Sequence, residues 1–335
     1  MTPGHSILIV RLGALGDIVH AIPAAAALRA AFPSARIDWL VDAKHREILD
    51  LVTCIDRVVV LDRSTPAGWV SVTRELRGAR YDAALDLQGL MKSAVLARAS
   101  GAARVLGFSI WHLREKGARP FYSESLDPTR DSAHGHVIHK NLRLVEALGV
   151  RDPRIEFPLR RVPSRARDTI LTESAGAPYA LLNPGAAWPN KRWYTHRFGE
   201  LAAFLSDVRG LVPFVLWGPG EEELAHHVIE SSHGTARLAP PTRLADLVEA
   251  SRDAALMVSG DTGPLHIATA VGTPVVSIFG PTDPVRNGPW AADDVSVSRF
   301  DACGCHYDRR CRQKHWCLKT IDVTEVTAAV QQRLR

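Results

Sequence analysis

The chain has 335 residues, of which 46% are hydrophobic and 23% are charged. This is the composition of a globular protein, and the length suggests two domains. No stretch of the sequence approaches the roughly 18 uninterrupted apolar residues of a membrane-spanning helix, and the amino terminus lacks the layout of a signal peptide. We therefore expect a cytoplasmic protein.

The net charge of +5 lies entirely in the first half. Residues 1–160 carry 22 Lys and Arg against 17 Asp and Glu, whereas residues 161–335 carry 19 against 19. Such a surplus is often only a solvated surface, but it also suits an acidic acceptor molecule or an anionic membrane surface. Nucleic acid is disfavoured, because the sequence has no basic tail, zinc-finger spacing or aromatic-rich basic motif.

Short apolar runs alternate with helical patterns through the first half. They predict strands at residues 7–10, 37–41, 57–61 and 83–87, and a helix from Ile18 to about Ala31. The first loop is not Gly-x-Gly-x-x-Gly and no ATPase P-loop is present, so nicotinamide enzymes and ATPases are disfavoured. Asp17, just before the helix, is interpreted either as a helix cap or as a general base for an attacking hydroxyl.

The same pattern restarts after a linker near residues 150–175. It predicts strands at 179–183, 212–217, 254–258 and 275–279 and a closing helix at 323–334. We expect an α/β protein with two Rossmann-like, doubly wound domains, residues 1–160 and 161–322, followed by the closing segment 323–335. The loop edges of two such sheets can face each other across a cleft, as in the GT-B arrangement of glycosyltransferases.

Residues 257–284 are the most informative segment. With the apolar runs at 254–258 and 275–279, they predict a parallel strand–helix–strand unit with polar loops at 259–263 and 280–283. Thr262 or Gly263 can cap the helix, and Pro264 suits its first position. A helix that starts in this way is shaped to meet an anion such as a phosphate. The alternative is an ordinary turn with good capping residues.

Two further loops of the second half place charge after predicted strands. Lys191 and Arg192 lie in a loop after the strand at 179–183, where they either neutralise a leaving diphosphate or are simply solvated. Residues 221–223 are three glutamates at a helix start, which either complement the helix dipole or hold the hydroxyls of a ribose. Together the three loops supply the parts of a nucleotide-diphosphate site.

Several of these segments carry a family resemblance that covers both predicted domains. They are residues 11–20 (RLGALGDIVH), 86–94 (DLQGLMKSA), 183–185 (NPG), 217–223 (WGPGEEE), 260–268 (GDTGPLHIA), Pro274 and 279–283 (FGPTD). As a set they resemble the bacterial heptosyltransferases of lipopolysaccharide inner-core synthesis, glycosyltransferase family 9.

The resemblance implies an inverting transfer of L-glycero-D-manno-heptose from ADP-heptose to a sugar hydroxyl, without a covalent intermediate, a metal or a cofactor. It implies that Asp17 is the general base, that Lys191 stabilises the departing diphosphate and that Glu222 holds the adenosine ribose. The other donor-binding candidates are Gly13, Gly16, Asn183, Arg192, Trp217, Gly218, Asp261, Thr262, Gly263, Pro264 and His266.

Residues 86–94 resemble the enzyme that adds the first heptose to Kdo of Kdo-lipid A, which implies peripheral contact with the cytoplasmic face of the inner membrane. Kdo carries a carboxylate and lipid A carries phosphates, so the candidate acceptor ligands are Arg57, Arg63, Gln88, Lys92 and Arg114. Lys116 replaces the proline of the family's Arg-Glu-Pro. A second-heptose transferase, a GT-B enzyme with another nucleotide sugar and a non-catalytic sugar-nucleotide-binding module therefore stay open.

A segment near the carboxyl end is rich in metal-ligating residue types: Cys303, Cys305, Cys311, Cys317, His306 and His315. The spacing is not the paired Cys-x2-Cys of zinc ribbons, so we expect no metal, with a structural zinc site as the alternative. Reduced thiols and a local disulfide are the other interpretations, and a cytosolic setting favours thiols. Within the family such segments are commoner in the second-heptose branch.

Overall fold

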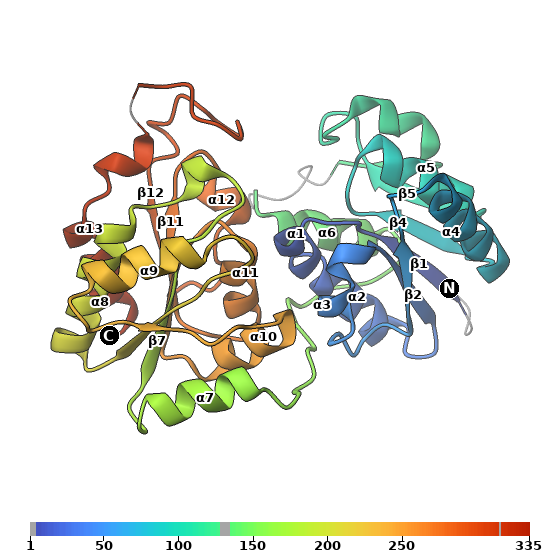
Figure 1. Ribbon diagram of the computed structural model, residues 1–335. Helices are drawn as coiled ribbons and strands as arrows, with labels where there is room; N and C mark the ends of the chain where they lie inside the picture. Colours follow the sequence, from blue (N-terminus) through green and yellow to red (C-terminus); the bar gives the residue numbers. More distant parts are fainter. Residues whose placement is uncertain (1–4, 128–134, 315) are drawn as a thin grey trace. The chain divides into compact units, whose positions relative to one another are not determined.

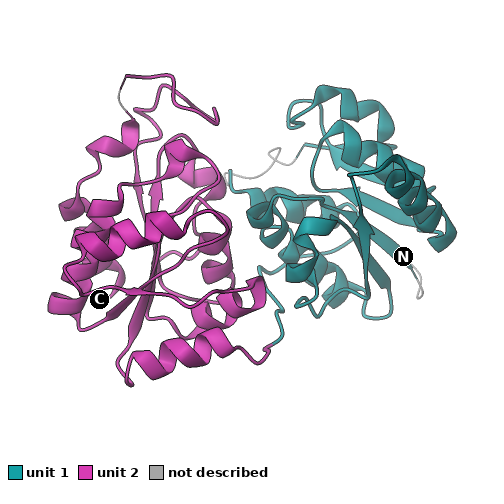
Figure 2. Cartoon of the chain, viewed as in Figure 1, with its two compact units in different colours: residues 1–160 teal, residues 161–335 magenta. Residues whose placement is uncertain are grey.

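The computed structural model describes residues 5–127, 135–314 and 316–335 (Figure 1). The chain forms two compact units, residues 1–160 and 161–335 (Figure 2). Over its described residues, each unit is built on one six-stranded sheet whose paired strands are all parallel. Within the described ranges, no helix is both long enough and apolar enough to cross a membrane.

In the first unit the strand order across the sheet is β3-β2-β1-β4-β5-β6. The strands are β1 (Ser6–Val10), β2 (Arg36–Asp42), β3 (Arg57–Leu61), β4 (Ala83–Asp86), β5 (Arg104–Phe108) and β6 (Glu124–Leu126). The α-helices and the 3-10 helices, written η, are α1 (Leu15–Val19), α2 (Ile22–Ala31), η1 (Ala43–His45), α3 (Arg46–Leu49), α4 (Pro66–Ala79), α5 (Met91–Ala99), η2 (Lys116–Phe121) and α6 (Val137–Glu146).

In the second unit the order is β12-β11-β10-β7-β8-β9. The strands are β7 (Tyr179–Asn183), β8 (Val212–Val215), β9 (Arg237–Leu238), β10 (Leu256–Gly260), β11 (Val275–Phe279) and β12 (Val295–Ser298). The helices are α7 (Arg165–Glu173), η3 (Pro189–Lys191), α8 (Thr195–Arg209), α9 (Glu222–Ser231), α10 (Leu244–Asp253), α11 (Gly263–Ala270), α12 (Pro284–Asn287), η4 (Cys317–Thr320) and α13 (Val323–Arg333).

Both sheets have the same topology. Numbered from its own first strand, each has the order 3-2-1-4-5-6 of the dinucleotide-binding folds. β1 pairs with β2 on one side and with β4 on the other, and β7 pairs with β8 and β10 in the same way. In such sheets ligands bind beside the carboxyl ends of the strands at this switch point. We therefore expect a ligand site among the residues that follow β1, β4, β7 and β10.

The central strands are almost wholly apolar because other elements cover both of their faces. All five residues of β1, β7, β10 and β11 are buried. The helix predicted at 323–334 is α13, which packs in the core of the second unit through the buried Val326 and Val330. Asp322 caps it by accepting a hydrogen bond from the Glu325 amide at 2.9 Å.

All the strands predicted from apolar runs are present. Four further strands, β5, β6, β9 and β12, were not predicted. β6 and β9 are only 3 and 2 residues long. β5 contains Gly107, where a Cβ would lie 2.3 Å from Cε2 of Tyr122, so the strand has a glycine where an apolar side chain would have signalled it.

The single helix predicted from Ile18 to Ala31 is wrong. The chain forms α1 and α2, separated by a turn at His20 and Ala21. Pro23 lies in the first turn of α2; it has no amide hydrogen for the carbonyl four residues earlier, and its ring would clash with that carbonyl in a continuous helix. Asp17 therefore belongs to a short helix of its own.

Candidate functional site

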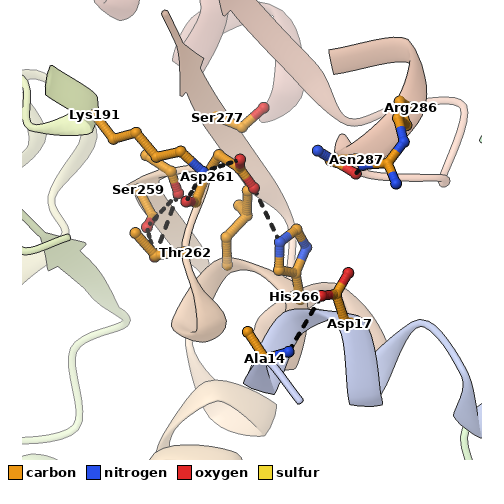
Figure 3. A network of polar contacts seen from close by, with 12 residues as sticks. Ala14, Asp17, Lys191, Ser259, Asp261, Thr262, His266, Ser277, Arg286 and Asn287 are labelled. Atoms are coloured by element: carbon orange, nitrogen blue, oxygen red, sulfur yellow. Dashed lines mark hydrogen bonds and ion pairs between the residues drawn. The ribbon is translucent and has the colours of Figure 1, made fainter. Parts of the chain in front are cut away.

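The carboxylate of Asp261, which directly follows β10, is the centre of the polar group in the second unit. Lys191 Nζ lies 2.5 Å from Asp261 Oδ2, and His266 Nε2 lies 3.2 Å from Oδ1 (Figure 3). The exposed fractions of the Lys191 and Asp261 side chains are only 14% and 7%. The sequence singled out all three residues, and the pairing of β7 with β10 brings their loops together.

Two opposing effects set the pKa of Asp261. Burial raises the pKa of Asp261, whereas the hydrogen bond with His266 and the Lys191 ammonium lower it. The lowering effects are larger, so the pKa lies well below its usual value and Asp261 is ionised at neutral pH. The ionised carboxylate holds the Lys191 ammonium at the switch point, 4.4 Å from the centre of the Trp188 ring.

Gly260, the last residue of β10, allows this close approach. A Cβ at this position would lie 2.8 Å from the carbonyl oxygen of Lys191, which is closer than real Cβ contacts come. Lys191 was expected in a loop, but it ends the short helix η3, which lies against the end of β10.

Asn183 and two hydroxyl groups fix the start of α11. Asn183 Nδ2 donates to Ser259 Oγ and to Thr262 Oγ1, each at 3.0 Å. The two hydroxyls lie 3.1 Å apart (Figure 3). Thr262 is the residue before the helix, but its hydroxyl faces these strand-end groups instead of capping it. The amides of the first turn are thus left without a side-chain cap, which suits an external anion.

The expected position of Pro264 needs a small correction. α11 begins at Gly263, so Pro264 is the second residue of the helix and not the first. The proline still removes a donor that the first turn could not have used within the helix.

Two glutamates of the loop after β8 have different surroundings. Glu221 Oε2 accepts a hydrogen bond from the Gly218 amide at 3.3 Å, and the same carboxylate occupies the space that a side chain on Gly185 would need. The exposed fraction of the Glu222 side chain is 60%, and its Oε1 lies 3.8 Å from His226 Nε2. A ribose-binding role for Glu222 stays a prediction. Glu221, which sequence analysis did not separate from its neighbours, links the loops after β7 and β8.

Two other donor-binding candidates anchor their own loops. Arg192 Nε donates to the carbonyl of Ala186 at 2.8 Å, and Trp217 Nε1 donates to the carbonyl of Ala239 at 2.9 Å. These bonds hold the loops after β7 and β8 at the carboxyl edge of the sheet.

In the first unit, Asp17 lies at the switch point of its own sheet. Asp17 Oδ2 accepts a hydrogen bond from the Ala14 amide at 3.2 Å (Figure 3). Asp17 Oδ1 lies 2.7 Å from Nη2 of Arg11, the residue after β1. The exposed fraction of the Arg11 side chain is 7%, and that of Asp17 is 33%. A buried guanidinium thus orients a carboxylate that solvent, or an acceptor, can still reach.

Arg11 begins the motif at 11–20 but was not singled out from the sequence as a separate candidate. Its guanidinium also donates to the carbonyl of Leu87, and its own carbonyl accepts a hydrogen bond from Trp39 Nε1 at 3.2 Å. Arg11 therefore ties the loop after β1 to the loop after β4. Gly16 lies in the first turn of α1, next to Asp17.

The loop after β4 is held by the fully buried Asp86. Its carboxylate accepts hydrogen bonds from Tyr122 Oη at 2.6 Å, Ser93 Oγ at 2.9 Å and the Gln88 amide at 2.9 Å. Burial raises the pKa of Asp86 above its ordinary value in spite of these donors. Gln88, an acceptor-binding candidate, uses its amide oxygen to accept a hydrogen bond from the Leu12 amide at 2.7 Å, so it links the same two loops.

Arg63 and Lys92 bring two cations to the carboxyl edge of the first sheet. Arg63 follows β3 and forms an ion pair with Asp42, the last residue of β2. Burial lowers the pKa of Lys92, and so does the charge of Arg63, whereas Asp42 and Glu115 oppose the shift. Lys44 also lowers the pKa of Lys92, so three cations act here against two carboxylates, an excess that suits an anion. Arg114 lies exposed in the loop after β5.

The structure contradicts the prediction for Arg57. Arg57 begins β3 and so lies at the amino edge of the sheet, opposite the edge that carries Asp17. Its Nη2 lies 2.8 Å from Oδ2 of the buried Asp38, and its Nη1 lies 3.2 Å from Oε1 of Glu75. Arg57 therefore neutralises a buried carboxylate and is not an acceptor ligand.

Residues 69–317 match the family model described as glycosyltransferase family 9 (heptosyltransferase). The chain belongs to glycosyltransferase family 9.

This family 9 glycosyltransferase is similar to curated heptosyltransferases over most of its length. It is 26% identical to lipopolysaccharide heptosyltransferase 1 of Pseudomonas aeruginosa, over 89% of this chain and 85% of the relative. It is 28% identical to lipopolysaccharide heptosyltransferase 1 of Escherichia coli K12, over 86% and 92%. It is 27% identical to lipopolysaccharide heptosyltransferase 3 of Escherichia coli, over 95% and 96%.

Solved structures share the fold of the glycosyltransferase. The glycosyl transferase family 9 structure from Veillonella parvula has a TM-score of 0.86 at 23% identity and covers 100% of this chain and 98% of its own. The E. coli heptosyltransferase WaaC with ADP-2-deoxy-2-fluoro heptose has a TM-score of 0.76 at 24% identity and covers 98% and 99%. The predicted α/β, GT-B fold is confirmed.

The cysteine-rich segment of the glycosyltransferase contains four free thiols. Cys305 Sγ and Cys311 Sγ lie 3.4 Å apart. Burial and a hydrogen bond with Cys303 raise the pKa of Cys317 to about 12. In the part of the chain that the structure describes, no group of three or more His, Cys, Asp or Glu side chains is arranged to hold a metal ion, and His315 lies outside that part.

His45 of the glycosyltransferase packs against the loop that carries Asp17, and it was not singled out from the sequence. It ends η1, and its ring packs against Gly13, where a Cβ would lie 2.7 Å from His45 Cδ2. Burial is the main cause that lowers the pKa of His45; Lys44 adds to it, and Asp42 opposes it. The neutral imidazole braces the loop that precedes Asp17, which explains why residue 13 is a glycine.

Replacing His45 with Gln should change how stability depends on pH. The unfolded state binds a proton near the ordinary pKa of 6.5, whereas the folded state resists protonation, so His45 lowers the free energy of unfolding as pH falls through 6.5. His45→Gln removes this loss, and its stability relative to the wild type should rise as pH falls. Urea unfolding of both proteins on either side of this pH checks it; an equal pH dependence would contradict it.

Proposed function

We propose that this glycosyltransferase transfers L-glycero-D-manno-heptose from ADP-heptose to Kdo of Kdo-lipid A in lipopolysaccharide core synthesis, at the cytoplasmic face of the inner membrane. The observation that carries the donor side is the buried group of Lys191, Asp261 and His266 beside the start of α11. The similarity of this chain to lipopolysaccharide heptosyltransferases, and to the E. coli heptosyltransferase WaaC solved with ADP-2-deoxy-2-fluoro heptose, supports the choice of donor.

On the donor side, the bond between heptose C1 and the diphosphate oxygen breaks, and its electron pair leaves with ADP. The Lys191 ammonium and the first-turn amides of α11 meet the negative charge that develops on the diphosphate. Asp261 would repel a phosphate, so we assign it to holding Lys191 and His266 in place and to contacting the heptose. Glu222 binds the ribose hydroxyls.

On the acceptor side, Asp17 takes the proton of the attacking acceptor hydroxyl. The oxygen of that hydroxyl forms a bond to heptose C1 on the face opposite the leaving diphosphate. The configuration at C1 is inverted in a single displacement. Arg11 holds Asp17 in the orientation that this proton transfer needs. Arg63, Lys92 and Arg114 bind the Kdo carboxylate and the lipid A phosphates.

A direct transfer assay tests the proposal. The purified protein is incubated with ADP-heptose and either Kdo-lipid A or its mono-heptosylated product, and the lipid is then weighed by mass spectrometry. We expect one heptose to be added to Kdo-lipid A, and no transfer from UDP- or GDP-sugars. Addition only to the mono-heptosylated lipid would overturn the acceptor and favour a later transferase, as the similarity to heptosyltransferase 3 allows. Transfer to neither lipid would overturn the function.

A further inference from the structure

The loop after β5 exposes a large aromatic side chain. The exposed fraction of Trp111 is 80%, and that of its neighbour Ile110 is 40%. Scattered apolar residues on a surface are ordinary and need no explanation. An indole with most of its surface in water is less common, because Trp is among the side chains that gain most from burial. The residues near Trp111 therefore indicate what this exposed indole could contact.

Contacts join Trp111 to the start of α5. Lys116 Nζ lies 6.0 Å from the centre of the Trp111 ring. The next residue, Gly117, packs on Met91, since a Cβ at 117 would lie 2.7 Å from the Met91 sulfur. The exposed fraction of Met91 is 39%. Ile110, Trp111, Lys116 and Met91 thus form one continuous surface, which we call the Trp111 surface.

Basic residues accompany these apolar side chains in the sequence. The segment 110–119 contains Arg114, Lys116 and Arg119 and a single acidic residue, Glu115. The Glu115 carboxylate accepts a hydrogen bond from the Met91 amide at 2.7 Å, so it is already engaged. An exposed Trp accompanied by Lys and Arg is typical of side chains at the headgroup level of an anionic bilayer. There the indole meets the acyl boundary and the cations meet the lipid phosphates.

The position of the Trp111 surface within the first unit fits a lipid. It follows β5 at the carboxyl edge of the sheet, the edge at which Asp17 follows β1 and Lys92 follows β4. Lys92 is the residue after Met91 at the start of α5, so a cation assigned to the acceptor lies one position along the helix from this surface. An acceptor whose acyl chains stay in the bilayer would need both features side by side.

We propose that the Trp111 surface docks this protein on an anionic lipid bilayer, with Trp111 and Ile110 at the acyl boundary and Lys116 on the lipid phosphates. The purpose of docking rests on the proposed function, because it brings a lipid-linked acceptor to Asp17. The docking itself is a binding event that needs neither donor nor acceptor.

Co-sedimentation of the full chain with vesicles tests the docking. We expect binding to vesicles of phosphatidylcholine with phosphatidylglycerol and little binding to phosphatidylcholine alone. Trp111→Ala should weaken partitioning about tenfold through lost apolar burial. Lys116→Glu should weaken it by more than tenfold, since each cation at such a surface contributes roughly fivefold. Added salt should weaken the binding of the wild type.

A matched control separates docking from a general loss of apolar surface. Val208, on α8 of the second unit, is 62% exposed, and Val208→Ala should leave vesicle binding unchanged. Equal thermal melting of Trp111→Ala and the wild type shows that the fold is intact. Binding by Trp111→Ala equal to that of the wild type, or no binding of the wild type to anionic vesicles, would overturn the proposal. Loss of self-association in Trp111→Ala without vesicle binding would also overturn it, in favour of a protein partner.

Activity on a soluble acceptor keeps the two proposals apart. With a Kdo acceptor stripped of its acyl chains, Trp111→Ala should turn over like the wild type, whereas with Kdo-lipid A in anionic vesicles it should be slower by about the loss in partitioning. If no heptose is transferred to any acceptor but vesicle binding depends on Trp111, the function fails and the docking stands. If transfer is normal and Trp111→Ala has no effect on vesicles, the docking fails and the function stands.

Discussion

Asp17→Ala should lower turnover by about 10²- to 10⁴-fold, the usual contribution of a general base. The affinity for ADP-heptose should remain close to that of the wild type, because Asp17 acts on the acceptor hydroxyl and donor binding rests on Lys191 and its neighbours. Steady-state kinetics with saturating acceptor measures the turnover, and calorimetric titration with ADP-heptose measures the affinity.

Two further variants sharpen this test. Asp17→Asn keeps the shape of the side chain and removes its basicity, so it should lose turnover as Asp17→Ala does. Asp50→Ala removes a carboxylate of the same unit that is 45% exposed and pairs with Arg46, and it should turn over normally. Normal turnover of Asp17→Ala would remove Asp17 from the mechanism and would favour the alternative interpretation of Asp17 as a helix cap.

Lys191→Met should damage both folding and catalysis. The variant leaves the Asp261 carboxylate, 7% exposed, without its ammonium partner, and breaking a buried ion pair in this way costs about 3–5 kcal/mol of unfolding free energy. It also removes the cation that meets the leaving diphosphate, which should lower turnover by about 10²- to 10³-fold. Urea unfolding and steady-state kinetics measure the two effects.

The double variant Lys191→Met with Asp261→Asn separates these two roles. A neutral amide in place of the unpaired carboxylate should restore most of the lost stability, because no buried charge is left. Turnover should stay low, since the cation is still missing. Recovery of turnover together with stability would show that Lys191 only supports the fold.

Sequence alone was a sound guide to the framework of both sheets. Strands such as β7 and β11 are covered on both faces, so each appears as a continuous apolar run bounded by polar residues. Elements without such a signal were missed or misjudged. The short edge strands β6 and β9 hold too few residues for a pattern, and the break between α1 and α2 was hidden inside one apolar, alanine-rich run.

The candidate site divides in the same way. The loops that carry Asp17, Lys191 and Asp261 were predictable, because their residues follow recognisable strands and belong to motifs of the family. The sequence could not give the partners of these side chains. Arg11 and Asp17 form their ion pair only because the chain turns into α1 directly after β1. Arg57 was misplaced because a cation at one end of an apolar run can lie at either edge of a sheet.

What the sequence determined by itself is the set of parts: two parallel α/β sheets, the loops at their carboxyl ends, and the residue types that suit a nucleotide-sugar donor and an anionic acceptor. These follow from local patterns of apolar and charged residues, which act over a few positions. The tertiary structure decided which parts meet. Lys191 and Asp261 are 70 residues apart in the chain and 2.5 Å apart in space, because strand pairing places the ends of β7 and β10 together. In the first unit, the pairing of β1 with β4 and with β2 likewise joins Arg11 to the loop after β4 and packs His45 on Gly13, which no local pattern records.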